Sequence, residues 1–206
     1  MSWLIEPQAL AELLQNAEVP VRLLDCRADL QEPEKAALAY GKGHIPNALH
    51  AHLERDLSGP VVPGKTGRHP LPEPAVWQAT LRRWGIHQHS SVVVYDAGNS
   101  MFAARAWWLL RWAGLTRVQV LHGGWHAWQR LGLPETTTVP QLSREPLAEG
   151  EIQVACPSEW LVTAEDLLQD LSTYTLLDAR APERFSGATR GGLPRFYSEP
   201  PARRAL

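Results

Sequence analysis

The chain has 206 residues, of which 44% are hydrophobic and 20% charged, a balance typical of a globular protein rather than a disordered one. Its formal net charge of −2 gives no electrostatic reason to expect nucleic acid or an anionic membrane as a partner. Two cysteines, Cys26 and Cys156, are too few for a disulfide scaffold, and no apolar run approaches the ~20 residues of a membrane helix. With no secretory signal in the sequence, we expect a cytoplasmic protein.

The first half of the chain alternates helical and strand patterns. Residues 7–16 have helix-forming composition with leucines on one face. Residues 21–25 form a short apolar run that is typical of a buried parallel strand. Glycine and proline punctuate residues 41–47, which predicts a turn before a short strand within residues 48–53. Residues 58–74 are rich in breakers and predict a long surface loop.

The same alternation continues further along the chain. Residues 73–84 predict a helix, residues 91–95 a β-branched strand, and residues 101–113 the strongest helix of the sequence. Residues 118–121 predict another strand and residues 125–131 a short helix. Strands that alternate with helices of about ten residues predict an α/β fold, with a mainly parallel sheet and helices on both faces.

Part of the sequence occurs twice. Leu23, Leu24, Asp25 and Arg27 recur as Leu176, Leu177, Asp178 and Arg180, and Trp3-Leu4-Ile5 recurs as Trp160-Leu161-Val162. The copies lie 153 and 157 residues apart, too far for a solenoid, whose repeats span ~20–50 residues. We therefore expect a duplicated domain: a first copy over residues 1–133, a linker over 134–157, and the start of a second copy over 158–206. Within that second copy, residues 173–178 predict a strand.

The loop after the strand of residues 91–95 is the main candidate site. Loops at the carboxyl ends of parallel strands bind ligands in α/β sheets, and the helix that follows directs free N–H groups at an anion or a thiolate. The residue at this strand end is Asp96. It could be an aspartyl nucleophile, a cap that accepts N–H bonds, or a vestigial catalytic position that also acts as a cap. The glycine at position 98, where a second acid is usual, disfavours the nucleophile.

Two pairs of histidines are candidate metal ligands. His50 and His52 form one His-x-His pair, and His87 and His89 form another. Alternate residues of a strand share a face, so either pair could chelate a metal. No carboxylate or cysteine spacing completes a site, and we expect no metal.

The cysteines and one helical stripe are further candidates. Cys26 follows a buried run and is expected to be a small core residue, whereas Cys156 lies in the expected linker with no adjacent base. Arg105, Trp108 and Trp112 share a helix face. They predict either a partly exposed aromatic face covered by the arginine, or a docking face for the second domain.

Five segments occur in the order of a known family. They are Leu23-Leu24-Asp25-Cys26-Arg27, Gly43-His44-Ile45-Pro46-Asn47-Ala48, Val92-Val93-Val94-Tyr95-Asp96, Ala104-Arg105-Ala106-Trp107-Trp108 and Leu121-His122-Gly123-Gly124-Trp125. Together they resemble the N-terminal half of two-domain rhodanese-type sulfurtransferases, which are the thiosulfate and 3-mercaptopyruvate sulfurtransferases. With the repeat, the resemblance covers residues 1–187.

The resemblance implies specific roles for two residues. In that family only the C-terminal half is catalytic, and the N-terminal half carries an aspartate at the position of the nucleophile, which Asp96 matches. The catalytic cysteine of the second half would fall at about position 250, beyond Leu206, so we expect this chain to lack the nucleophile and to be inactive alone. Arg184 aligns with the substrate-binding arginine of the family.

The implied reaction is a ping-pong transfer of sulfane sulfur. A cysteine takes sulfur from thiosulfate or 3-mercaptopyruvate and passes it to cyanide or a thiol acceptor. The implied partners are a small anionic sulfur donor and that acceptor, with no nucleic acid or membrane and no cofactor. The alternative is a non-catalytic rhodanese-like module that binds an anion or a protein at the Asp96 loop.

Overall fold

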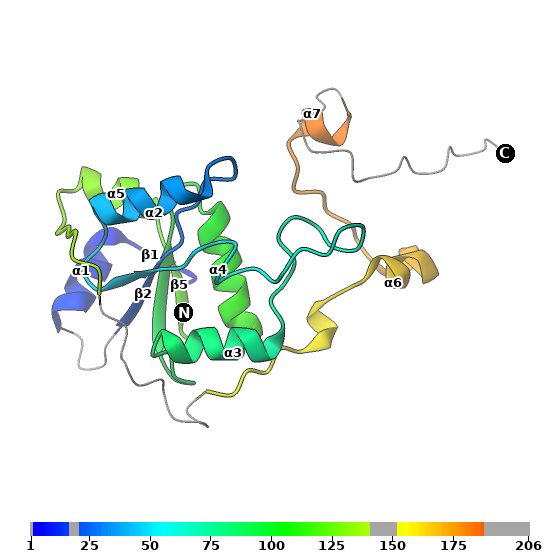
Figure 1. The fold of residues 1–206 in the computed structure, drawn as a ribbon, viewed down its shortest axis with the longest axis horizontal. Helices are drawn as coiled ribbons and strands as arrows, with labels where there is room; N and C mark the ends of the chain where they lie inside the picture. The colour runs from blue at the N-terminus through cyan, green and yellow to red at the C-terminus, as the bar shows by residue number, and fades with distance from the viewer. Residues whose placement is uncertain (1, 17–20, 141–151, 188–206) are drawn as a thin grey trace. The chain divides into compact units, whose positions relative to one another are not determined.

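A computed structural model shows the fold (Figure 1) and describes residues 2–16, 21–140 and 152–187. The chain divides into two compact units. The first comprises Met1–Val62 and Thr66–Ser158, and the second comprises Pro63–Lys65 and Glu159–Leu206. Among the described residues, no helix is both long enough and apolar enough to cross a membrane.

The first unit is an α/β layered structure. Its elements are β1 (Leu4–Ile5), α1 (Pro7–Asn16), β2 (Val21–Asp25), α2 (Pro33–Lys42), β3 (Ala48–His50), α3 (Pro74–Arg83), β4 (Ser91–Tyr95), α4 (Met101–Trp112), β5 (Val118–Leu121) and α5 (Gly124–Arg130). The described strands form one five-stranded sheet in the order β1-β5-β4-β2-β3, and every neighbouring pair is parallel. The α/β fold with a parallel sheet is therefore confirmed.

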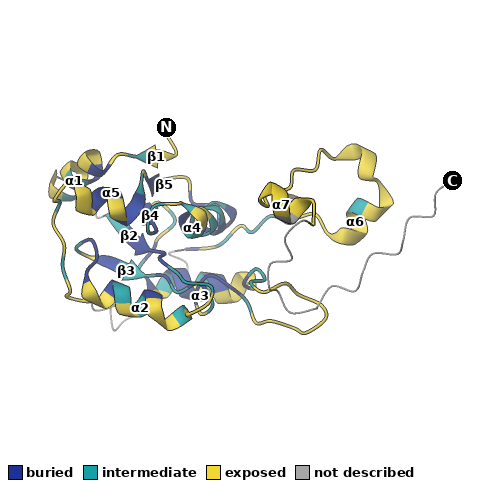
Figure 2. Cartoon of the chain, turned by 90° about the horizontal axis from the view of Figure 1, so that it is seen from above, coloured by how far each residue is buried: buried dark blue, intermediate teal, exposed yellow. Residues whose placement is uncertain are grey.

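Helices cover both faces of the sheet. Successive strand residues point to opposite faces, so the central strands are apolar throughout. Leu24, Val92 and Val94 pack against α3 and α4. Leu23 and Val93 belong to the other cluster, which includes residues of α1 and α5. Figure 2 shows these strands as buried, in agreement with the continuous apolar runs of β2 and β4.

The sequence patterns missed the helix α2. The turn expected from residue 41 onward begins only after Lys42, because Gly41 and Lys42 belong to the last turn of α2. The only buried residues of this helix are Ala36 and Tyr40, which leaves it without a visible apolar period. The strand β1 was missed for a similar reason, since it is only two residues long.

The strand expected at residues 173–178 does not form. The second unit contains the helices α6 (Ala164–Gln169), η2 (Leu171–Thr173) and α7 (Pro182–Phe185), and residues 174–178 have no regular structure. A strand needs a neighbour to pair its backbone, and the described residues of this unit supply none. Leu177 is consequently 90% exposed, although Leu24, its counterpart in the first copy, is fully buried.

Part of the expected linker belongs to the first unit. Of the expected linker over residues 134–157, the described stretch that precedes the short helix η1 (Ser158–Trp160) packs on α3 and α4. The N–H of Cys156 donates to the carbonyl oxygen of Trp112 at 2.9 Å. Ile152 is fully buried and joins the core cluster beneath α3 and α4. This stretch therefore contributes apolar burial to the first unit.

We predict that Ile152→Ala lowers the free energy of unfolding by about 2–5 kcal/mol, as for other buried isoleucines truncated to alanine. Urea unfolding of the chain measures this value. Val139→Ala is the matched control, since Val139 is 57% exposed and its truncation should cost less than ~0.5 kcal/mol. An equally small effect at both positions would show that the stretch behaves as a free linker.

Candidate functional site

Asp96 lies in the loop between β4 and α4, and its side chain caps the helix. The carboxylate is almost completely buried. Its Oδ1 accepts the N–H groups of Gly98 at 2.9 Å and Ser100 at 3.0 Å. Its Oδ2 accepts those of Phe102 at 3.0 Å and Ala103 at 3.2 Å. The expected structural cap is confirmed, because this one side chain satisfies N–H groups that the first turn of α4 would leave without partners.

The neighbouring loop after β5 closes over Asp96. The N–H of Trp125 donates to the carbonyl oxygen of Asp96 at 2.8 Å. Gly124 has a φ of +55°, and a Cβ at this position would lie 2.4 Å from the same carbonyl oxygen. Gly124 is therefore required for this close approach. An enclosed carboxylate with both oxygens hydrogen-bonded is poorly placed to attack a substrate, which argues against the nucleophile reading.

Cys26 is a core residue. It is 1% exposed, and its thiol donates to the carbonyl oxygen of Leu24 at 3.6 Å. Burial raises the pKa of this thiol well above its usual value, and the charges of Asp25 and Asp96 raise it further. The expected packing role is confirmed, and the thiolate needed for sulfur chemistry is disfavoured here.

Cys156 is partly exposed, and none of its contacts with described residues would activate a thiol. Burial raises its pKa, and its backbone has a φ of +42°. Both cysteines of the chain therefore lie in surroundings that disfavour the thiolate.

Arg105 holds the two ends of the long loop together rather than covering an exposed aromatic face. Its guanidinium donates to the carbonyl oxygen of Leu57 at 2.8 and 3.0 Å, and to those of His69 and Pro70 at 3.1 Å each. In the same stripe, Trp112 is 3% exposed. The expected partly exposed face holds at Arg105 and Trp108 but not at Trp112, whose Nε1–H donates to the carbonyl oxygen of Pro157 in the stretch before η1 at 3.1 Å. The alternative of a docking face for the second domain stays a prediction.

A carboxylate between two histidines was missed by the sequence patterns. Glu54 lies 3.4 Å from Nδ1 of His52 and 3.3 Å from Nε2 of His69. His69 belongs to the long loop, so the spacing of residues in the sequence does not predict that it contacts Glu54.

The expected histidine pairs do not converge on a metal site. The rings of His50 and His52 lie with their centroids 5.9 Å apart at an interplanar angle of 74°. Within residues 2–16, 21–140 and 152–187, no group of three or more His, Cys, Asp or Glu side chains could hold a metal ion.

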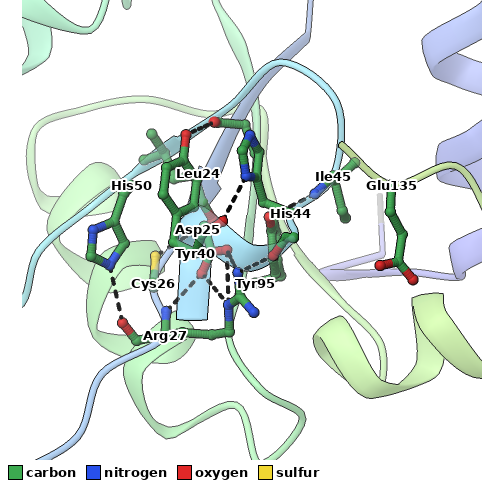
Figure 3. Close-up of polar contacts among 12 residues, drawn as sticks. Leu24, Asp25, Cys26, Arg27, Tyr40, His44, Ile45, His50, Tyr95 and Glu135 are labelled. Atoms are coloured by element: carbon green, nitrogen blue, oxygen red, sulfur yellow. Dashed lines mark hydrogen bonds and ion pairs between the residues drawn. The ribbon is translucent and has the colours of Figure 1, made fainter. Parts of the chain in front are cut away.

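A buried ion pair links two of the sequence motifs (Figure 3). Arg27 donates to the carboxylate of Asp25 at 2.6 Å and to the carbonyl oxygen of Gly43 at 2.7 Å. Its guanidinium lies 4.9 Å from the ring centroid of Trp125. The hydroxyl of Tyr95 accepts the N–H of Ile45 at 3.2 Å. These contacts join β2, β4 and the turn at residues 43–47.

Arg184 lies in α7, but its side chain is outside the described part of the chain. Its predicted role in substrate binding stays a prediction. The metal, cofactor and location expectations likewise rest on the sequence alone.

Comparison with known proteins agrees with this architecture. The family model "Rhodanese-like domain" matches residues 6–131. A Pseudomonas aeruginosa protein named "Probable 3-mercaptopyruvate sulfurtransferase" is 44% identical over 187 residues, and the match covers 89% of this chain and 63% of the relative. Thiosulfate sulfurtransferase of Gallus gallus is 29% identical over 192 residues, with 89% and 63% covered.

A solved structure shows the same fold. The crystal structure of the 3-mercaptopyruvate sulfotransferase SseA from Escherichia coli is 31% identical, with a TM-score of 0.75, and the match covers 96% of this chain and 72% of that one. The chain spans 63% of the length of both curated relatives above. Because the family model matches more than half of its residues, the chain belongs to the family of proteins with a rhodanese-like domain.

Proposed function

We propose that this chain provides the non-catalytic rhodanese domain of a sulfurtransferase. The reaction moves sulfane sulfur from 3-mercaptopyruvate or thiosulfate to cyanide or a thiol acceptor. Support comes from relatives that carry these sulfurtransferase names. The observation that carries the proposal is the carboxylate of Asp96, which occupies the N–H groups at the start of α4.

Sulfur transfer needs a thiolate in an electropositive site. The thiolate attacks the sulfane sulfur and becomes a persulfide, while the bond to the donor breaks and pyruvate or sulfite leaves with its electron pair. The N-terminus of α4 would stabilise such a thiolate, but a carboxylate stands there. Cys26 and Cys156 both have a raised pKa. We therefore infer that this polypeptide alone does not turn over sulfur donors.

The second rhodanese domain of the proposal begins at about residue 158. Its support is local geometry that repeats the first copy. Arg180 donates to Asp178 at 2.6 Å, as Arg27 donates to Asp25 at 2.6 Å. In this proposal Arg184 contacts the anionic group of the donor, a task that suits a guanidinium.

The alternative of an anion-binding module at the Asp96 loop has little support. The N–H groups that would bind the anion already bond to the side chain of Asp96. No described feature favours a protein partner at this loop.

We predict that the purified chain forms thiocyanate from cyanide and either donor no faster than its Cys26→Ala/Cys156→Ala double variant. Neither thiol lies in a site that favours the thiolate, so removing both should change nothing. A colorimetric thiocyanate assay, with intact-mass detection of a persulfide, measures this. Turnover that exceeds the double variant, or a persulfide on either cysteine that cyanide removes, would contradict the proposal.

We predict that Asp96→Ala lowers the free energy of unfolding by at least ~3 kcal/mol, since each buried donor left without a partner costs ~1–3 kcal/mol. Denaturant unfolding measures the loss. Asp29→Ala is the control: Asp29 accepts the N–H groups of Gln31 and Glu32 at an exposed loop, and its loss should cost ~1 kcal/mol or less.

Unfolding in the presence of sulfate distinguishes the two hypotheses for Asp96, a structural cap or part of an anion-binding site. Sulfate should stabilise the Asp96→Ala variant, because the freed N–H groups can donate hydrogen bonds to its oxygens. It should leave the wild-type melting temperature close to that of a chloride control of equal ionic strength. A specific rise in the wild-type melting temperature with sulfate, abolished in Asp96→Ala, would favour the anion-binding module instead.

A further inference from the structure

A cavity of about 430 Å³ opens beside β3, within the first unit. Leu49 and His50 of β3, Trp84 after α3, and Val139 with Pro140 line it. Its volume falls within the ~300–1,000 Å³ that small-molecule sites occupy. None of the groups assigned to sulfur chemistry or to the cap of α4 takes part in it.

Two arginines provide the charge of this cavity, and both are held by one buried acid. Arg55 and Arg83 line the cavity. Asp56 is 2% exposed and accepts from Arg55 at 2.8 and 3.1 Å and from Arg83 at 2.6 Å. One carboxylate balances one of the two guanidinium charges. Each guanidinium has five N–H donors, so donors remain on both for a further acceptor.

The remaining ionisable groups among the described residues that line the wall, His50 and Tyr40, carry no charge near neutral pH. Burial lowers the pKa of His50, which keeps its ring neutral. Burial also raises the pKa of Tyr40, another lining residue, to about 12. Glu34 acts on Arg55 through its charge, but its side chain is exposed and does not line the cavity. The two guanidiniums therefore set the electrostatic preference of the site.

The aromatic wall is held in place by stacking (Figure 3). The ring of Tyr40 lies between those of His44 and His50, with centroid distances of 4.0 and 5.1 Å and interplanar angles of 17°. Its hydroxyl donates to the carbonyl oxygen of Ala48 at 2.7 Å. This face of the cavity is consequently formed before any ligand arrives.

His44 also holds the segment that leads to Val139 and Pro140. Backbone N–H groups of His44 and Thr136 each donate to the other residue's carbonyl oxygen at 2.9 Å. The Nε2 of His44 lies 3.2 Å from the carbonyl oxygen of Thr138, directly before Val139 and Pro140. Walls that are positioned in advance reduce the entropic cost of binding.

We propose that this cavity binds a small organic monoanion in which a carboxylate is attached to a flat apolar body. The carboxylate accepts N–H groups from Arg55 and Arg83, the geometry that guanidinium groups favour. The body lies against Leu49, Trp84 and Val139. The excess of one positive charge over Asp56 selects a monoanion over a neutral molecule of the same shape.

Isothermal titration calorimetry of the full chain with benzoate tests the proposal, and benzamide is the neutral probe of matching shape. We expect saturable one-to-one binding of benzoate, and binding of benzamide at least about tenfold weaker, since a charge-assisted bond is about twice as strong as a neutral one. Arg83→Gln should weaken benzoate binding by a similar factor, whereas Arg130→Gln, an exposed arginine of α5, should leave it unchanged.

Because Arg83→Gln also removes a bond to Asp56, a second variant tests the cavity without changing that ion pair. Val139→Trp fills the cavity from an exposed position, and Val61→Trp is its control, since the two valines are 57% and 55% exposed. We expect benzoate binding to be lost only in Val139→Trp. Absence of saturable binding to the wild type, equal affinity for benzamide, or unchanged affinity in Val139→Trp would each overturn the proposal.

Discussion

The N–H groups at the start of α4 must find acceptors, and the way they do so governs both the stability and the chemistry of the first unit. The carboxylate of Asp96 accepts two of them, from Phe102 and Ala103, and also accepts the N–H groups of Ser100 and Gly98 just before the helix. The carbonyl oxygen of Asp96 meanwhile accepts the N–H of Trp125, which ties the loop after β4 to the loop after β5. An electropositive helix end that could stabilise a thiolate is thus used to hold two loops together.

Comparison of the two copies of the repeat shows which features form locally and which need the rest of the domain. Asp178 and Arg180 form the same ion pair as Asp25 and Arg27, because a two-residue spacing brings the groups together without help from the rest of the chain. In the first copy Arg27 also bonds to Gly43 and lies over Trp125. The strand is different, since it depends on hydrogen bonds to distant neighbours, and it forms only in the first copy.

This contrast also explains how much could be predicted from the sequence. β2, β4 and β5 were located because apolar and β-branched runs are local signals, and the cap at Asp96 followed from the strand-turn-helix order. α2 was missed because Ala36 and Tyr40 are its only buried residues. The contacts of Arg105 and the group around Glu54 could not be predicted, since both depend on how the loop over residues 58–73 returns to the sheet.

The contacts of that loop show that buried charged side chains in this domain mainly form hydrogen bonds with backbone groups. The loop has no regular structure to satisfy its carbonyl groups, and Arg105 supplies the donors from α4. Asp96 does the complementary work for N–H groups. Both carboxylate oxygens of Asp96 are hydrogen-bonded, and such a side chain has little left to offer a solute. Arg55 and Arg83 differ because, among the described residues, Asp56 is the one acid that they share, and this leaves donors and one positive charge in excess at the cavity beside β3.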